Sequence, residues 1–173
     1  GLVGSEMCIR DRTRRASIPL QHGAHRIGNR TDADMERWRQ HGLGQFIHWG
    51  VYAIPGGFWE GKCYPGAAEW IRSWKEMPKD AYDSLYKQFN PTSFDAKAWA
   101  KQARQMGANY MIFTTKHHDG FCLWPTRTTK HSVASSPWKN GKGDVVQELR
   151  KACDKYGLKL SLIHISEPTR PEP

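Results

Sequence analysis

The sequence predicts an α/β fold that amounts to about three strands of a (β/α)8 TIM barrel, truncated before the barrel closes. Short apolar segments alternate with amphipathic helices, which is typical of a parallel sheet. Long loops follow the strands and no glycine-rich phosphate-binding turn joins strand to helix, which favours a barrel over a doubly wound sheet. No apolar run approaches the roughly 20 residues that span a bilayer, and mean hydropathy is -0.74, which excludes a membrane-spanning protein.

The two ends of the chain are predicted to be foreign to this fold. LVGSEMCIRD (Leu2 to Asp11) and LSLIHISEPTR (Leu160 to Arg170) can be encoded by opposite strands of one DNA duplex, and both resemble a translated transposase-end adapter of sequencing libraries. We therefore expect residues 1–12 and 160–173 to be adapter-derived and exclude them from fold reasoning. Residues 13–31 are interpreted as a linker or lead-in and residues 32–159 as the partial barrel, with both natural ends missing.

The first predicted elements are a helix, a strand and a long loop. Asp32 to Gln40 has helical spacing and stops before Gly42 and Gly44. Gln45 to Trp49 is a short apolar run between glycines, which predicts a buried strand. Gly50 to Lys79 is too rich in Gly and Pro for one element and too aromatic for a disordered linker, so we expect an ordered, functional loop.

Residues 80–159 are predicted to repeat this order of helix, strand and long loop. The predicted elements are helices over Asp80 to Phe89 and Thr92 to Met106, a buried strand over Tyr110 to Thr115, a second long loop over Lys116 to Gly143, a helix from Asp144 through Tyr156, and the start of a third strand at Leu158 and Lys159. Thr92 with Asp95 gives the second helix a capping signature, and Gly107 ends it.

Charge and cysteine content narrow the function classes. The chain has 26 Lys and Arg against 17 Asp and Glu, but the two signs are interspersed through the fold, which is typical of a solvated surface. No basic stripe interleaves with aromatic residues, so we expect no nucleic-acid partner. The four cysteines form no CxxC pair, which argues against a zinc ribbon or a thioredoxin site and leaves a disulfide open.

Candidate functional residues cluster where two strands end. His48 closes the first strand, Glu69 and Trp70 lie in the loop after it, and His117 and His118 follow the second strand. The active face of a barrel is the carboxyl end of its strands, where imidazoles and a carboxylate can bind hydroxyls and an indole can stack on a sugar.

Other interpretations of these residues stay open. His48 fits a structural core histidine equally well, and Trp59 and Trp74 fit a core patch under the loop. Glu60, Glu69 and Glu76 fit surface charges as well, and spacing alone does not show which of them belongs to the site. The run from His117 to Asp119 also suggests a metal site, but neighbours on an extended chain point to opposite faces, so the two histidines are not expected to hold one ion.

Three motifs resemble one family. FIHWGVYAIPGG (Phe46 to Gly57), AAEW (Ala67 to Trp70) and TTKHHDGFCLWP (Thr114 to Pro125) resemble the N-terminal part of the catalytic barrel of the α-L-fucosidases, the retaining glycoside hydrolase family 29. The resemblance covers Asp32 to Lys159. It implies that His48, Glu69, Trp70, His117 and His118 bind the hydroxyls and apolar face of a fucosyl unit, with Trp124 in the pocket wall. It implies no metal and no cofactor.

The resemblance also implies a two-carboxylate retaining mechanism. The family nucleophile is an Asp near the end of the fourth strand and the acid/base comes later, so we expect both beyond this chain and the fragment itself to be inactive. Neither Glu69 nor Asp119 is assigned to these roles. Asn140 to Gly143 departs from the commoner family pattern as a small extra loop.

Two alternatives to a fucosidase fragment remain. One is a non-catalytic glycan-binding relative that keeps the histidines, and the other is a metal-dependent hydrolase using His48, His117 and Asp119. The expected partner is a fucosylated glycan or glycoconjugate, with no nucleic acid and no membrane. A secreted, periplasmic or lysosomal location is implied by analogy alone.

Overall fold

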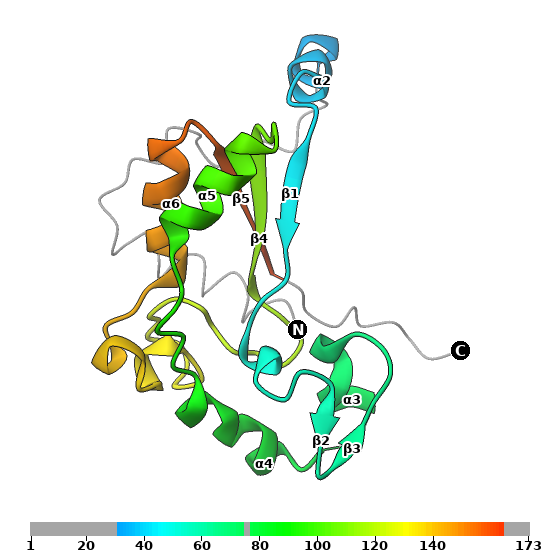
Figure 1. Cartoon of the computed structure of the whole chain (residues 1–173), viewed down its shortest axis with the longest axis vertical. Coiled ribbons are helices and arrows are strands. Elements are labelled where there is room, and N and C mark those ends of the chain that lie inside the picture. Colours follow the sequence, from blue (N-terminus) through cyan, green and yellow to red (C-terminus); the bar gives the residue numbers. More distant parts are fainter. Residues whose placement is uncertain (1–30, 75–76, 165–173) are drawn as a thin grey trace.

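A three-stranded parallel sheet forms the centre of the fold. The structure, a computed structural model, describes residues 31–74 and 77–164. The sheet has the order β1 (Gly44–Ile47), β4 (Tyr110–Lys116), β5 (Lys159–His164), and both pairs are parallel. Helices α5 (Ala96–Gln105) and α6 (Val145–Lys155) pack against each other beside it (Figure 1). The prediction of an α/β fold with three strands is therefore confirmed.

The two helices begin at aspartate caps. The Asp95 carboxylate accepts hydrogen bonds from the backbone N–H groups of Lys97 and Ala98 at 2.8 and 3.1 Å, and Asp144 accepts from Gln147 at 2.7 Å. The helix predicted from Thr92 therefore begins later than expected, at Ala96. The reason is that the Asp95 side chain satisfies the free amide groups of the first turn, so the preceding residues form a separate turn.

The first strand is less buried than predicted. We expected Gln45 to Trp49 to be a buried strand, but β1 covers Gly44–Ile47, none of its residues is buried, and Phe46 is 49% exposed. The cause is its place at the sheet edge, where only β4 pairs with it among the described residues. By contrast, Met111 and Phe113 of the central strand are fully buried.

The long aromatic loop contains several short elements. Residues 51–74 form η1 (Val51–Ala53), a small hairpin of β2 (Phe58–Trp59) and β3 (Lys62–Cys63), η2 (Ala68–Trp70) and α3 (Ile71–Trp74). Trp59 packs on the core, as one interpretation of the sequence proposed, whereas the Trp74 side chain lies outside the described residues. The single helix predicted over Asp80 to Phe89 is two pieces, α4 (Lys79–Asp83) and η3 (Ser84–Gln88).

The N-terminal helix and the second long loop follow the predicted order. Helix α2 (Asp32–Arg39) begins at a capping box between Thr31 and Asp34. The second loop contains η4 (Val133–Ser135) and η5 (Trp138–Gly141). At the predicted small extra loop, Lys139 and Asn140 take left-handed φ angles of 50° and 55°.

The third strand runs further than predicted. We expected it to be cut off at Lys159, but residues 160–164 complete β5 beside β4. A parallel edge strand is held by backbone hydrogen bonds, so an alternating apolar peptide of any origin can occupy it. Residues 1–12 and 165–173 lie outside the described residues, so the adapter origin of the ends stays a prediction.

Two further observations concern the cysteines and the question of a membrane span. Cys122 and Cys153 are buried and Cys63 is exposed, and all three are free thiols. Within residues 31–74 and 77–164, no helix combines the length and apolarity that crossing a membrane requires.

Candidate functional site

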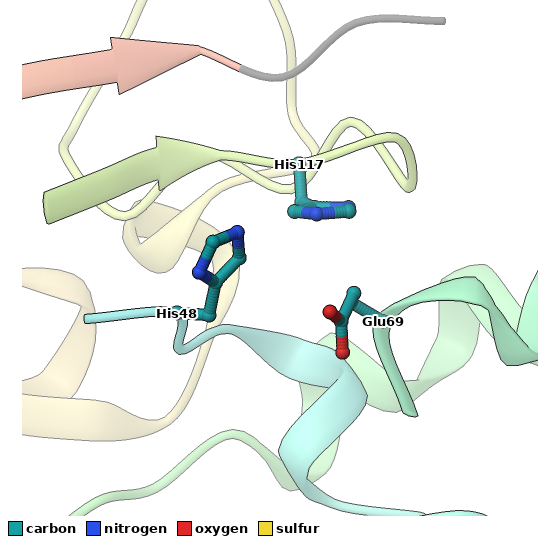
Figure 2. A group of neighbouring side chains, drawn as sticks. All are labelled: His48, Glu69 and His117. Atoms are coloured by element: carbon teal, nitrogen blue, oxygen red, sulfur yellow. The ribbon is translucent and has the colours of Figure 1, made fainter. Parts of the chain in front are cut away.

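Three side chains converge at the carboxyl edge of the sheet. His48 directly follows β1, His117 directly follows β4, and Glu69 comes from η2 (Figure 2). Their ligand atoms all lie within 4.8 Å of one another. Parallel strands end at the same edge, and because Ile47 pairs with Phe113, β4 continues beyond the end of β1. This longer strand brings His117 close to His48, with ring centroids 5.6 Å apart.

Trp70 and His118 complete one side of this cluster. The rings of Trp70 and His118 are 3.9 Å apart at their centroids, and Trp70 meets His117 edge-on at 6.1 Å. The two histidines are themselves only 4.6 Å apart. The expectation that they point to opposite faces is therefore wrong. The strand ends at Lys116, and the backbone turns, with the N–H of Gly120 donating to the carbonyl of His117 at 2.9 Å.

His117 is a buried, neutral imidazole. Its side chain is 4% exposed. Burial, with smaller contributions from the neighbouring His118 and His48, lowers the pKa of His117 from 6.5 to about 4, and Glu69 opposes this shift. A neutral ring offers one N–H donor and one acceptor. Its Nδ1 atom makes no hydrogen bond within the described part of the chain.

Tyr52 is a site residue that sequence reasoning missed. It is 4% exposed, and its ring meets that of His117 edge-on at 5.4 Å. Burial, followed by the charges of Asp119 and Glu69, raises the pKa of its phenol. The hydroxyl has no hydrogen-bond partner among residues 31–74 and 77–164. Nothing in the sequence distinguishes Tyr52 from the other aromatic residues of this loop.

Two other residues considered from the sequence lie in the protein interior. Trp124 is 2% exposed and belongs to the hydrophobic core. Asp119 is 4% exposed, and its carboxylate accepts hydrogen bonds from Tyr82 and from the backbone of Phe121. Asp119 therefore does not join the cluster that the metal-hydrolase alternative requires.

Glu69 takes the place of Asp119 in the only grouping of metal-ligand type found in the described residues. The ligand atoms of His48, Glu69 and His117 lie within 4.8 Å of one another, close enough to share a metal ion or one polar group of a ligand. A carboxylate, imidazoles and an indole at one sheet edge are typical of a carbohydrate-active α/β protein.

The chain belongs to the alpha-L-fucosidase family. The family model described as Alpha-L-fucosidase matches residues 22–172. Alpha-L-fucosidase 1 of Arabidopsis thaliana is 36% identical over 127 residues, which are 73% of this chain and 21% of that protein. The tissue alpha-L-fucosidase of Homo sapiens is 32% identical over 135 residues, which are 73% of this chain and 29% of that protein.

Solved structures agree in sequence and in fold. The GH29 alpha-L-fucosidase of Bacteroides thetaiotaomicron is 51% identical, with a TM-score of 0.73, over 85% of this chain and 32% of that chain. AlfC of Lactobacillus casei in complex with its alpha-L-fucose product is 36% identical, with a TM-score of 0.71, over 76% of this chain and 41% of that one. The chain thus spans less than a third of the curated relatives described above.

Proposed function

We propose that this chain is the N-terminal part of the (β/α)8 catalytic barrel of a retaining α-L-fucosidase. The two faces of the sheet support the barrel. In β4 and its neighbour β1, Met111 and Phe113 point to one face and are fully buried, whereas Phe46 points to the other face and is 49% exposed. An apolar side chain exposed on the face opposite these buried residues is what a barrel wall presents when the remaining strands are absent.

The site residues bind the fucosyl unit in this proposal. The observation that carries it is the convergence of His48, Glu69 and His117 beside the Trp70 indole in a member of this family. Glu69 accepts hydrogen bonds from hydroxyls, and the neutral ring of His117 both donates and accepts. Trp70 presents its face to the apolar side of the sugar, and His118 packs on that indole. Trp124 supports the pocket wall from the core.

The unpaired polar atoms fit such a ligand. His117 Nδ1 and the Tyr52 hydroxyl are buried without partners in the described chain, and a buried polar group without a hydrogen bond costs roughly 1 to 3 kcal/mol. Sugar hydroxyls supply both donors and acceptors. The relative from Lactobacillus casei was solved with alpha-L-fucose, and we extend that chemistry to a fucosylated glycan or glycoconjugate as the substrate of the parent protein.

The chain by itself does not hydrolyse glycosides in this proposal. A retaining glycosidase needs two carboxyl groups about 5 to 5.5 Å apart on either side of the scissile bond. Asp119 is buried and already holds two hydrogen bonds, which leaves Glu69 as the carboxylate of the described cluster. The family resemblance implies a nucleophile near the end of a fourth strand and a later acid/base, so this proposal assigns both to parts of the parent barrel beyond Lys159.

Titration of L-fucose into the chain tests the binding role. We expect saturation-transfer NMR to detect L-fucose, and His48→Ala to weaken the binding at least tenfold because one hydroxyl contact is lost. The matched control is His41→Ala, because His41 lies at the opposite end of the sheet, beside Lys159. Equal loss in both variants, or none in His48→Ala, would contradict the assignment.

An aryl fucoside tests the catalytic part. The chain should release no aryl group above the rate of the buffer. Turnover that disappears in His48→Ala would show that the chemistry lies within this chain after all.

A further inference from the structure

One buried carboxylate near the site has no role in binding the sugar. Asp119 is 4% exposed, and both of its oxygens are occupied. The backbone N–H of Phe121 donates to Oδ1 at 3.0 Å, and the Tyr82 hydroxyl donates to Oδ2 at 3.1 Å. Burying a carboxylate costs folding free energy. We therefore expect its hydrogen bonds to have a role that an apolar residue in its place could not perform.

The contacts of Asp119 connect three separate segments. Asp119 follows His117 and His118 in the turn after β4, and Tyr82 lies in α4. Arg72 lies in α3, two residues after Trp70, and its Nη1 donates to the backbone carbonyl of Asp119 at 3.3 Å. The guanidinium also lies over the Tyr82 ring, 5.6 Å from its centroid. Arg72, Tyr82 and Asp119 are called the Asp119 cluster below.

The Asp119 cluster connects the two segments that carry the proposed sugar-binding residues. The turn that carries His117 and His118 is fixed to α4 through Tyr82 and to the segment of Glu69 and Trp70 through Arg72. These contacts support the packing of Trp70 on His118, whose ring centroids are 3.9 Å apart. The site needs this alignment because a sugar contact displaced by about 1 Å loses most of its hydrogen-bond strength.

We propose that Asp119, Tyr82 and Arg72 are positioning residues that hold His117 and His118 in register with Glu69 and Trp70 for fucosyl binding. This inference rests on the proposed function for its ligand. The carboxylate and the guanidinium act through hydrogen bonds and packing, and neither touches the sugar. Asp83 completes the arrangement, because its carboxylate pairs with the Arg72 Nη2 at 3.5 Å.

The test combines binding with a direct view of the Trp70 ring. The chain is labelled with 5-fluorotryptophan, the Trp70 resonance is assigned with Trp70→Phe, and L-fucose affinity and melting temperature are measured in parallel. Tyr82→Phe removes only the hydroxyl, Asp119→Asn removes the charge at nearly constant shape, and Arg72→Gln removes the guanidinium. Asp95→Ala is the stability control, because Asp95 caps α5 and has no contact with the Asp119 cluster in the described structure.

We expect Tyr82→Phe and Asp119→Asn to shift or broaden the Trp70 resonance and to weaken L-fucose binding at least fivefold. Asp95→Ala should lower the melting temperature while both readouts stay at wild-type values. An unmoved Trp70 resonance together with unchanged affinity in Tyr82→Phe would overturn the proposal, as would equal effects in Asp95→Ala. If Asp119→Asn does not fold, Tyr82→Phe and Arg72→Gln still decide the question.

The two proposals fail in different ways. Should the wild-type chain not bind L-fucose, the proposed function fails, but the Trp70 resonance still reports whether the Asp119 cluster positions that ring. Should the wild type bind and the Asp119 cluster variants bind equally well, only the positioning role fails.

Discussion

Acidification should destabilise the chain through His117. Burial lowers the pKa of this histidine from 6.5 to about 4 in the folded protein. Between pH 6.5 and 4, His117 is protonated in the unfolded chain but stays neutral in the folded chain. The free energy of unfolding therefore decreases as the pH falls. Each pKa unit corresponds to about 1.4 kcal/mol, so the loss between pH 7 and 4 amounts to at most about 3 kcal/mol.

The variant His117→Gln isolates this contribution. Glutamine keeps one donor and one acceptor but does not titrate. Urea unfolding of both proteins at pH 7, 5.5 and 4.5 gives two stability profiles. We expect the wild type to lose up to about 3 kcal/mol relative to the variant as the pH falls. Parallel profiles would refute the reasoning, because they would mean that His117 titrates normally in the fold.

Three further predictions concern stability and assembly. Asp95→Ala removes the acceptor of two amide hydrogen bonds at the start of α5 and should cost about 1 kcal/mol in urea unfolding, whereas Asp95→Asn should restore most of it. Gly143→Ala places a Cβ atom against the buried Trp138 ring, closer than a real Cβ atom can approach, and should cost about 1 to 3 kcal/mol, seen as a lower melting temperature; an unchanged melt would contradict the close packing. Phe46→Lys should reduce self-association in sedimentation velocity, because Phe46 is 49% exposed on one face of the sheet; Met106→Lys, at the exposed C-cap of α5, is the control, and equal effects would argue against the sheet face.

Local chemistry made much of the fold predictable. Asp144 as the start of α6 follows from capping preference alone, whereas α5 begins after Asp95 and not at the predicted Thr92. The site at the carboxyl edge followed from the parallel sheet, because every strand delivers its last side chains to the same edge. His48 and His117 were therefore expected to be neighbours, although 69 positions separate them in the printed sequence.

The parts of the site that the sequence did not predict depend on tertiary contacts, which residue spacing does not encode. The choice of Glu69 over Glu60 is set by the hairpin, which leaves Glu60 exposed in a turn with a φ of 47°; Glu76 lies outside the described residues. The hydrogen bond between Tyr82 and Asp119 joins α4 to the turn after β4, and this approach depends on how α4 packs. The proximity of His117 and His118 depends on where β4 stops, and strand ends are the least certain part of any sequence interpretation.

The site has a fixed half and an exchangeable half. His48 and His117 leave the sheet at positions set by strand register, whereas Glu69 and Trp70 arrive from the segment between η1 and α3. That segment enters and leaves on the same edge of the sheet and adds no strand to it. Residues of this segment other than Glu69 and Trp70 can therefore be exchanged without a change in the strand register that places the histidine pair. Grafting this segment between relatives is a direct way to transfer ligand preference without rebuilding the sheet.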